Sequence, residues 1–163
     1  MQDIYKFALE FEKENREFYE ECASGTDDKT LESVFKELAA EEAKHEKIVQ
    51  ALADDRNVAS VKSDINMRAK EAFDKIAENF DESSLMPEDQ VDIYKKAKDL
   101  ETKSKNFYKE HAEKSDNKTV ERVFNELSAE EKKHEAILDN IITMVNRPNT
   151  WLDDAEWYHL EEY

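Results

Sequence analysis

The sequence of this 163-residue chain repeats itself at a constant offset of 89 residues. Residues 4–50 align without a gap on residues 93–139, and 24 of the 47 aligned positions are identical. A period of this length is too long for a solenoid repeat. We therefore expect a fold made of two equivalent halves, each large enough to form a pair of helices.

Each half has the pattern of a helical hairpin. Glycine occurs once and proline twice, so few residues interrupt helices. Apolar residues recur at helical spacing; in the first half they are Ile4, Ala8, Phe11, Phe18 and Cys22, then Leu31, Val34, Phe35, Leu38, Ile48, Val49 and Leu52. Short turns with candidate N-cap residues, at 26–28 and 115–117, divide each half. The pattern predicts helices at 3–24, 28–54, 90–114 and 117–146.

The segment that links the two hairpins is long and contains a helical stretch of its own, at 65–80. A helix of about 25 residues is roughly 38 Å long, and a linker of this size can return along it. The second and third long helices can then run parallel, as in ferritin-like folds with one crossover connection. We predict an all-α, ferritin-like four-helix bundle at 1–146, with hairpins 3–54 and 90–146, a crossover at 55–89 and an aromatic tail at 147–163.

Composition excludes several classes of partner. With 24 Lys and Arg against 41 Asp and Glu, the formal net charge is −17, so nucleic acid and anionic membrane surfaces are unfavourable partners. Cys22 is the single cysteine, so neither a disulfide nor a CxxC metal site forms within the chain. The first residues are too charged for a signal peptide, and no apolar run reaches transmembrane length. We expect a cytoplasmic protein.

A Glu-x-x-His motif occurs at equivalent positions of the two halves, as Glu42 to His45 and Glu131 to His134. Residues three apart share one face of a helix, so each motif can offer a carboxylate and an imidazole to one metal ion. Glu12 lies 15 residues before the turn residue Asp27, and Glu42 lies 15 residues after it. These two side chains should therefore meet at one level of the bundle.

The second half repeats this arrangement, with Glu101 and Glu131 equidistant from Asp116. The six residues lie in phase with the apolar stripes, where an unpaired charge is costly. Two divalent cations would neutralise the four carboxylates. The alternatives are surface charges at the edge of an ordinary apolar stripe, or a buried Glu/His hydrogen-bond network. The occurrence of the motif in both halves, at matching levels, favours a two-metal site.

These motifs resemble the rubrerythrin branch of the ferritin-like superfamily. Glu12 with Tyr19 and the first Glu-x-x-His motif looks like one half-site, and Glu101 with Tyr108 and the second motif looks like the other. The resemblance implies a non-haem di-iron centre in which Glu42 and Glu131 bridge the metals. It also implies that Glu12 and Glu101 are terminal ligands and that each metal has one histidine. Iron is the expected metal; manganese and zinc are the alternatives.

The two tyrosines are predicted to be catalytic residues, on the strength of the same resemblance. Tyr19 and Tyr108 lie two turns from Glu12 and Glu101. Their hydroxyls would bond a ligand carboxylate or donate an electron; the alternative is an ordinary core tyrosine.

Two features depart from the family pattern. Rubrerythrins usually carry a rubredoxin-like module with two CxxC pairs, which this sequence lacks. They also carry a further glutamate three residues after the third-helix ligand, where this chain has Ser104; the first-helix counterpart is Asn15. These departures weigh against efficient peroxidase chemistry.

The tail contains a third Glu-x-x-His motif, Glu156 to His159, without a partner hairpin to complete a metal site. Four large side chains of the tail are expected to dock on the bundle or on a second subunit of a homodimer; they are Trp151, Trp157, Tyr158 and Leu160.

Three functions remain open at this stage. The first is an oxidoreductase that reduces hydrogen peroxide or oxygen with electrons from an external donor such as a rubredoxin. The second is a ferroxidase or an iron-binding or storage protein. The third is a helical scaffold with a non-redox metal such as zinc.

Overall fold

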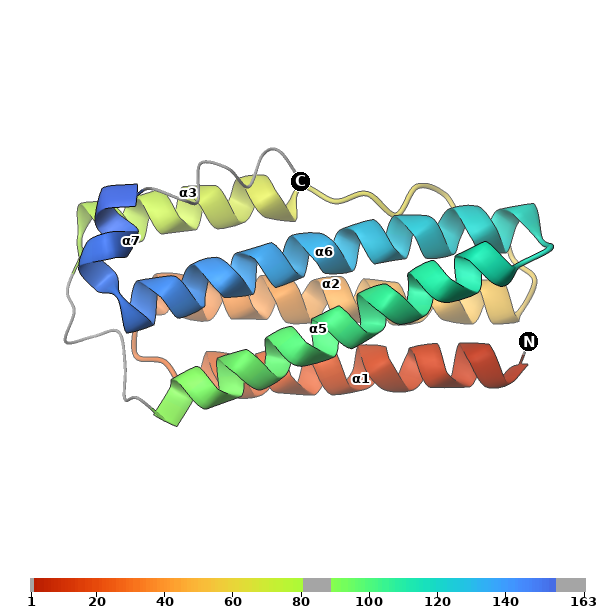
Figure 1. Ribbon diagram of the computed structural model, residues 1–163, viewed down its shortest axis with the longest axis horizontal. Helices are drawn as coiled ribbons and strands as arrows, with labels where there is room; N and C mark the ends of the chain where they lie inside the picture. The colour runs from red at the N-terminus through yellow and green to blue at the C-terminus, as the bar shows by residue number, and fades with distance from the viewer. Residues whose placement is uncertain (1, 81–88, 155–163) are drawn as a thin grey trace.

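The computed structural model describes residues 2–80 and 89–154, and every regular element within them is a helix. Four long helices lie side by side, and two shorter ones pack at the outside (Figure 1). In chain order they are α1 (Gln2–Ser24), α2 (Lys29–Ala53), α3 (Ile65–Glu78), α5 (Asp89–Lys114), α6 (Lys118–Asn146) and α7 (Pro148–Asp154). The bounds of the four long helices differ from the predicted ranges by at most one residue at either end.

Equivalent side chains begin the second helix of each hairpin. The Asp28 carboxylate accepts a hydrogen bond from the Leu31 backbone N–H at 2.8 Å, and the Asn117 side chain accepts from the N–H groups of Thr119 and Val120. Both residues have extended backbone, as N-cap residues require. The short turns therefore set where α2 and α6 start, and with them the level of every later residue.

This capping makes a first prediction. Replacing Asp28 by alanine should lower the free energy of unfolding by about 1 kcal/mol, because the Leu31 backbone N–H loses its acceptor. Asp27→Ala is the matched control, since Asp27 is exposed and caps no helix. Urea unfolding of both variants measures the difference; an equal loss in the two would contradict the assigned cap.

The topology is that of two antiparallel hairpins joined by one crossover. The chain runs along α1 and returns along α2; the crossover then carries it back, so that α5 runs parallel to α2 (Figure 1). This confirms the predicted all-α bundle with a single crossover. A purely up-and-down bundle would have placed the second hairpin in the opposite direction.

The crossover helix α3 lies against both α2 and α6. Its buried face includes Phe73, which packs edge-on against Trp151 of α7. The Trp151 side chain is fully buried and donates its indole N–H to Asn140 of α6 at 2.6 Å. The first turns of the predicted tail thus pack on the bundle. Trp157, Tyr158, Leu160, Glu156 and His159 lie outside the described residues.

Two apolar clusters fill the bundle, one toward each end. One contains Tyr19 and Phe35, and the other contains Tyr108 and Phe124. The six predicted ligand positions lie between these clusters, which leaves a polar layer at mid-length of the bundle. No helix within residues 2–80 and 89–154 has both the length and the apolar character needed to cross a membrane.

Candidate metal centre

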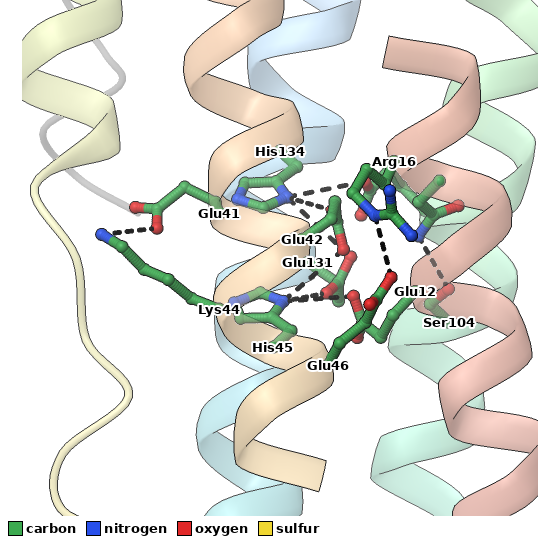
Figure 2. A network of polar contacts seen from close by, with 12 residues as sticks. Glu12, Arg16, Glu41, Glu42, Lys44, His45, Glu46, Ser104, Glu131 and His134 are labelled. Carbon is green, nitrogen blue, oxygen red and sulfur yellow. Dashed lines mark hydrogen bonds and ion pairs between the residues drawn. The ribbon is translucent and has the colours of Figure 1, made fainter. Parts of the chain in front are cut away.

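The structure brings all six predicted ligand side chains together in the polar layer. Each of the four long helices contributes to it: α1 and α5 give one glutamate each, and α2 and α6 give one Glu-x-x-His motif each. Figure 2 shows the ligand side chains of α1, α2 and α6 turned toward one another. All six are buried, with exposed fractions between 0 and 2%; they are Glu12, Glu42, His45, Glu101, Glu131 and His134. The alternative of charges at a surface edge is therefore wrong.

The ligand atoms form two overlapping groups, in each of which they all lie within 4.8 Å of one another. One group consists of Glu12, Glu42, His45 and Glu131, and the other of Glu42, Glu101, Glu131 and His134. Glu42 and Glu131 belong to both groups. This overlap is what two neighbouring metal ions with two shared carboxylates require, because each group supplies one imidazole and one unshared glutamate.

The histidines contact carboxylates of the opposite hairpin. Nδ1 of His45 lies 2.7 Å from Oε1 of Glu131, and Nδ1 of His134 lies 2.8 Å from Oε1 of Glu42. The same two nitrogens lie 3.5 Å from the nearest oxygens of Glu12 and Glu101, respectively. Both Nδ1 atoms thus face the space among the carboxylates, where they would act as metal ligands.

The tyrosines also act across the two halves. The Tyr19 hydroxyl donates to Oε1 of Glu101 at 2.6 Å, and the Tyr108 hydroxyl donates to Oε1 of Glu12 at 2.6 Å. Burial raises the pKa of both hydroxyls well above the usual value, and the neighbouring carboxylates raise it further. The hydroxyls therefore stay protonated and hold the two unshared carboxylates. Their proposed electron-donating role stays a prediction.

A pseudo-two-fold axis passes through the centre. Asn15 and Ser104 are equivalent residues of the two halves, and the Asn15 amide donates to the Ser104 hydroxyl at 3.1 Å. The rings of the equivalent residues His45 and His134 stack with centroids 5.6 Å apart and planes 5° apart. Equivalent residues can contact each other only near the axis that relates the halves. The 89-residue duplication is thus also a duplication in space.

The pKa of the two shared glutamates and the pKa of the two unshared glutamates shift in opposite directions. Burial raises the pKa of Glu42 and Glu131 well above the usual value, and the neighbouring carboxylates raise it further. Burial also acts to raise the pKa of Glu12 and Glu101, but it is outweighed by histidine charges and hydrogen bonds, so that the pKa of each falls. Without metal, the two shared glutamates therefore hold protons to higher pH than Glu12 and Glu101 do.

The pKa of each histidine rises despite burial, which by itself lowers it. Carboxylates outweigh burial at both rings; Glu12 acts most on His45, and Glu101 acts most on His134. The raised pKa means that each ring keeps its second proton to higher pH. A metal ion that binds Nδ1 must displace a proton from the ring.

The donor set fits two divalent cations. In each of the four glutamates, the Oε2 atom is buried and makes no hydrogen bond. Nε2 of His134 is also buried and makes no hydrogen bond. Buried oxygens that carry negative charge are costly without a cation or a donor. Oxygen and imidazole ligands suit iron, manganese and zinc. The alternative of a complete Glu/His hydrogen-bond network leaves these oxygens unsatisfied.

Sequence reasoning missed an outer ring of charged residues around the centre. Glu41 and its equivalent Glu130 are almost fully buried beside the shared glutamates, and they pair with Lys44 and Lys133, respectively. Glutamate is so frequent in this chain that neither position stands out on its own. Their equivalence in the repeat was the available signal.

The tyrosine hydrogen bonds make a second prediction. Tyr19→Phe and Tyr108→Phe should each weaken metal affinity by about 10- to 100-fold, the usual effect of losing a group that holds a ligand. Tyr94→Phe is the matched control, because the Tyr94 hydroxyl is also buried but makes no hydrogen bond. Competition titrations with a chelator measure the affinities. If all three variants bind alike, the hydroxyls do not hold the carboxylates.

Comparison with known proteins agrees with the geometry. The family model described as Rubrerythrin matches residues 3–142, and it matches residues 92–156 a second time. The second match starts at residue 92 and the first at residue 3, which is the 89-residue offset of the internal repeat. No curated protein and no solved structure matches the chain.

Proposed function

The chain belongs to the rubrerythrin family, and from that premise we propose that it is a non-haem di-iron oxidoreductase. It reduces hydrogen peroxide or oxygen with electrons from an external donor such as a rubredoxin. The observation that carries the proposal is the pair of overlapping ligand groups that share Glu42 and Glu131.

The protein's first task in this function is to hold two cations at a fixed separation. Glu42 and Glu131 would bridge them, while Glu12 with His45 and Glu101 with His134 would each complete one side. Metal pairs that act together on an oxygen substrate are typically about 3.5–4 Å apart. The hydrogen bonds from Tyr19 and Tyr108 fix the two terminal carboxylates, so the site is shaped before substrate arrives.

Two ferrous ions would each supply one electron, so that one hydrogen peroxide takes up two electrons and two protons and leaves as two water molecules. The protein must provide a dry pocket and a controlled proton supply. Burial of all six ligands excludes bulk water. The two tyrosine hydroxyls, which stay protonated, would hold the terminal carboxylates Glu101 and Glu12 in place.

Stopped-flow mixing tests the proposal. Protein loaded with ferrous iron without oxygen is mixed with hydrogen peroxide or with oxygen, and the absorbance of ferric iron is followed. We expect iron to be oxidised by hydrogen peroxide or by oxygen, with about one peroxide consumed per two irons oxidised. Repeated turnover should then require a reductant.

Turnover that is sustained by added ferrous iron rather than by the reductant would favour the ferroxidase alternative. A chain that retains zinc but never oxidises iron would favour the scaffold. The Glu21→Gln, Glu110→Gln double variant serves as the control, because both residues are exposed and equivalent in the repeat. It should react like the unmodified protein.

A further inference from the structure

The two halves of the centre are covered differently by the crossover. Residues 58–63 are fastened to α6 by three contacts: Arg122 to the Val58 carbonyl at 2.7 Å, Glu126 to the Val61 N–H at 3.4 Å, and Lys133 to the Ser63 carbonyl at 3.3 Å. On the α2 side, Arg68 of α3 pairs with Glu41 at 3.1 Å. Residues 58–63 are therefore hydrogen-bonded along α6, while α3 packs on both α2 and α6.

A cleft of about 420 Å³ lies on the α2 side of this segment. Its walls are formed by residues of α2 and by residues 60–64, and His45 is part of the lining; the other α2 residues are Glu41, Lys44 and Ile48. The Lys44 side chain at its mouth is 64% exposed. Figure 2 shows Lys44 and Glu41 extending from α2 toward the crossover, on the side of His45 away from α1.

One imidazole ring separates this cleft from the carboxylates. His45 lines the cleft, while its Nδ1 lies 2.7 Å from Glu131 and 3.5 Å from Glu12. A small molecule in the cleft is therefore one side chain away from the metal position that His45 serves. The cleft volume falls in the range of small-molecule sites.

On the equivalent side of the other half, the cleft does not reach the histidine. A second cleft of about 420 Å³ is lined by Glu130 and Lys133, the equivalents of Glu41 and Lys44, but His134 is not part of its lining. The Lys133 side chain is only 15% exposed, and Ile137, the equivalent of Ile48, is fully buried. Nε2 of His134 is buried too.

We propose that the cleft at Lys44 and Ile48 is the entrance to the centre and that the two metal positions are consequently inequivalent. Metal ions and small reactants enter and leave past His45, and the His134 position exchanges only through the His45 position. This proposal rests on the proposed metal centre. It adds a path of entry and an order of metal exchange, neither of which follows from the six ligands alone, because the ligands are symmetric.

Zinc release tests the inference without any redox reaction. Protein loaded with zinc is mixed with excess 4-(2-pyridylazo)resorcinol, which absorbs visible light when it binds zinc. We expect two phases of equal amplitude, the fast one from the His45 position. Lys44→Trp should fill the mouth of the cleft and slow both phases about tenfold, which corresponds to about 1.4 kcal/mol of added barrier. Ile48→Ala should open the wall and speed both.

Phe7→Trp is the matched control, because Phe7 is 56% exposed on α1 and the change adds similar bulk away from the cleft. It should leave both phases unchanged, and the zinc content of all variants should equal that of the unmodified protein. Release in one phase, or equal rates in Lys44→Trp and Phe7→Trp, would overturn the entrance. Failure of the unmodified protein to bind zinc or iron would instead overturn the metal centre itself.

Discussion

Replacing Glu42 and Glu131 together by glutamine is expected to abolish metal binding. These two residues belong to both ligand groups, so the double variant removes two charged oxygen donors from each metal position. Glutamine keeps the size of the side chain and resembles the protonated glutamate that burial favours without metal. We therefore expect the metal-free variant to remain folded, with a melting temperature equal to or above that of the metal-free parent.

Metal analysis after ferrous loading and desalting measures the outcome. The unmodified protein should approach two metal ions per chain, one for each ligand group, and the double variant should retain none. The control is Glu21→Gln with Glu110→Gln, an equally large change of charge at exposed, equivalent positions. Loss of metal in the control, or full binding in the double variant, would mean that the cluster is not the metal site.

The second large effect concerns how stability depends on pH. The folded pKa of Glu42 and Glu131 lies above the unfolded value of about 4.3. Their contribution to stability is therefore fully present below that pH and is lost as the pH rises through the folded pKa. His45 and His134 act in the same direction, because their pKa is also raised. Their contribution is present below about pH 6.5 and is lost as the pH rises further.

Glu12 and Glu101 behave in the opposite way. Their lowered pKa gives stability that is present above the unfolded value and is lost only as the pH falls through the folded pKa. Between about pH 5 and 8 these two glutamates stay ionised, so they add little to the change of stability with pH. The metal-free protein should therefore become less stable from pH 5 to pH 8 as far as this centre controls it.

The stability gained from bound metal should grow as the pH rises, because the metal binds the deprotonated ligands. At free metal 100-fold above the dissociation constant, one site adds about 2.7 kcal/mol to the free energy of unfolding. For a domain of this size that raises the melting temperature by about 5–10 °C. Melting metal-free and zinc-loaded protein between about pH 5 and 8 should show a gain that grows with pH. A gain that stays constant or shrinks would mean that the clustered groups release no protons to the metal.

Much of the fold follows from the sequence because the repeat supplies two kinds of information at once. Apolar spacing predicts the helices, and the turn residues Asp27 and Asp116 set the register in each hairpin. Equal distances from the turn then place Glu12 level with Glu42, and Glu101 level with Glu131. These relations depend only on the rise per residue of a helix.

What the sequence could not predict depends on how the hairpins pack. Tyr19 bonds the glutamate of the opposite half rather than its own neighbour Glu12, since the antiparallel packing of α1 on α5 brings Glu101 to its hydroxyl. The cleft at Lys44 reaches the histidine and the cleft at Lys133 does not, although the two have the same local sequence pattern. They differ because residues 58–63, which are not part of the repeat, are hydrogen-bonded to α6.

The most direct measurement is anomalous X-ray scattering from crystals of the manganese- or zinc-loaded protein, recorded at the absorption edge of the metal. We predict two peaks within the bundle, about 3.5–4 Å apart as in other two-metal sites. One peak should lie beside His45 and Glu12 and the other beside His134 and Glu101, with Glu42 and Glu131 contacting both. Peaks at the protein surface, or a single peak without a shared carboxylate, would contradict the two-metal centre.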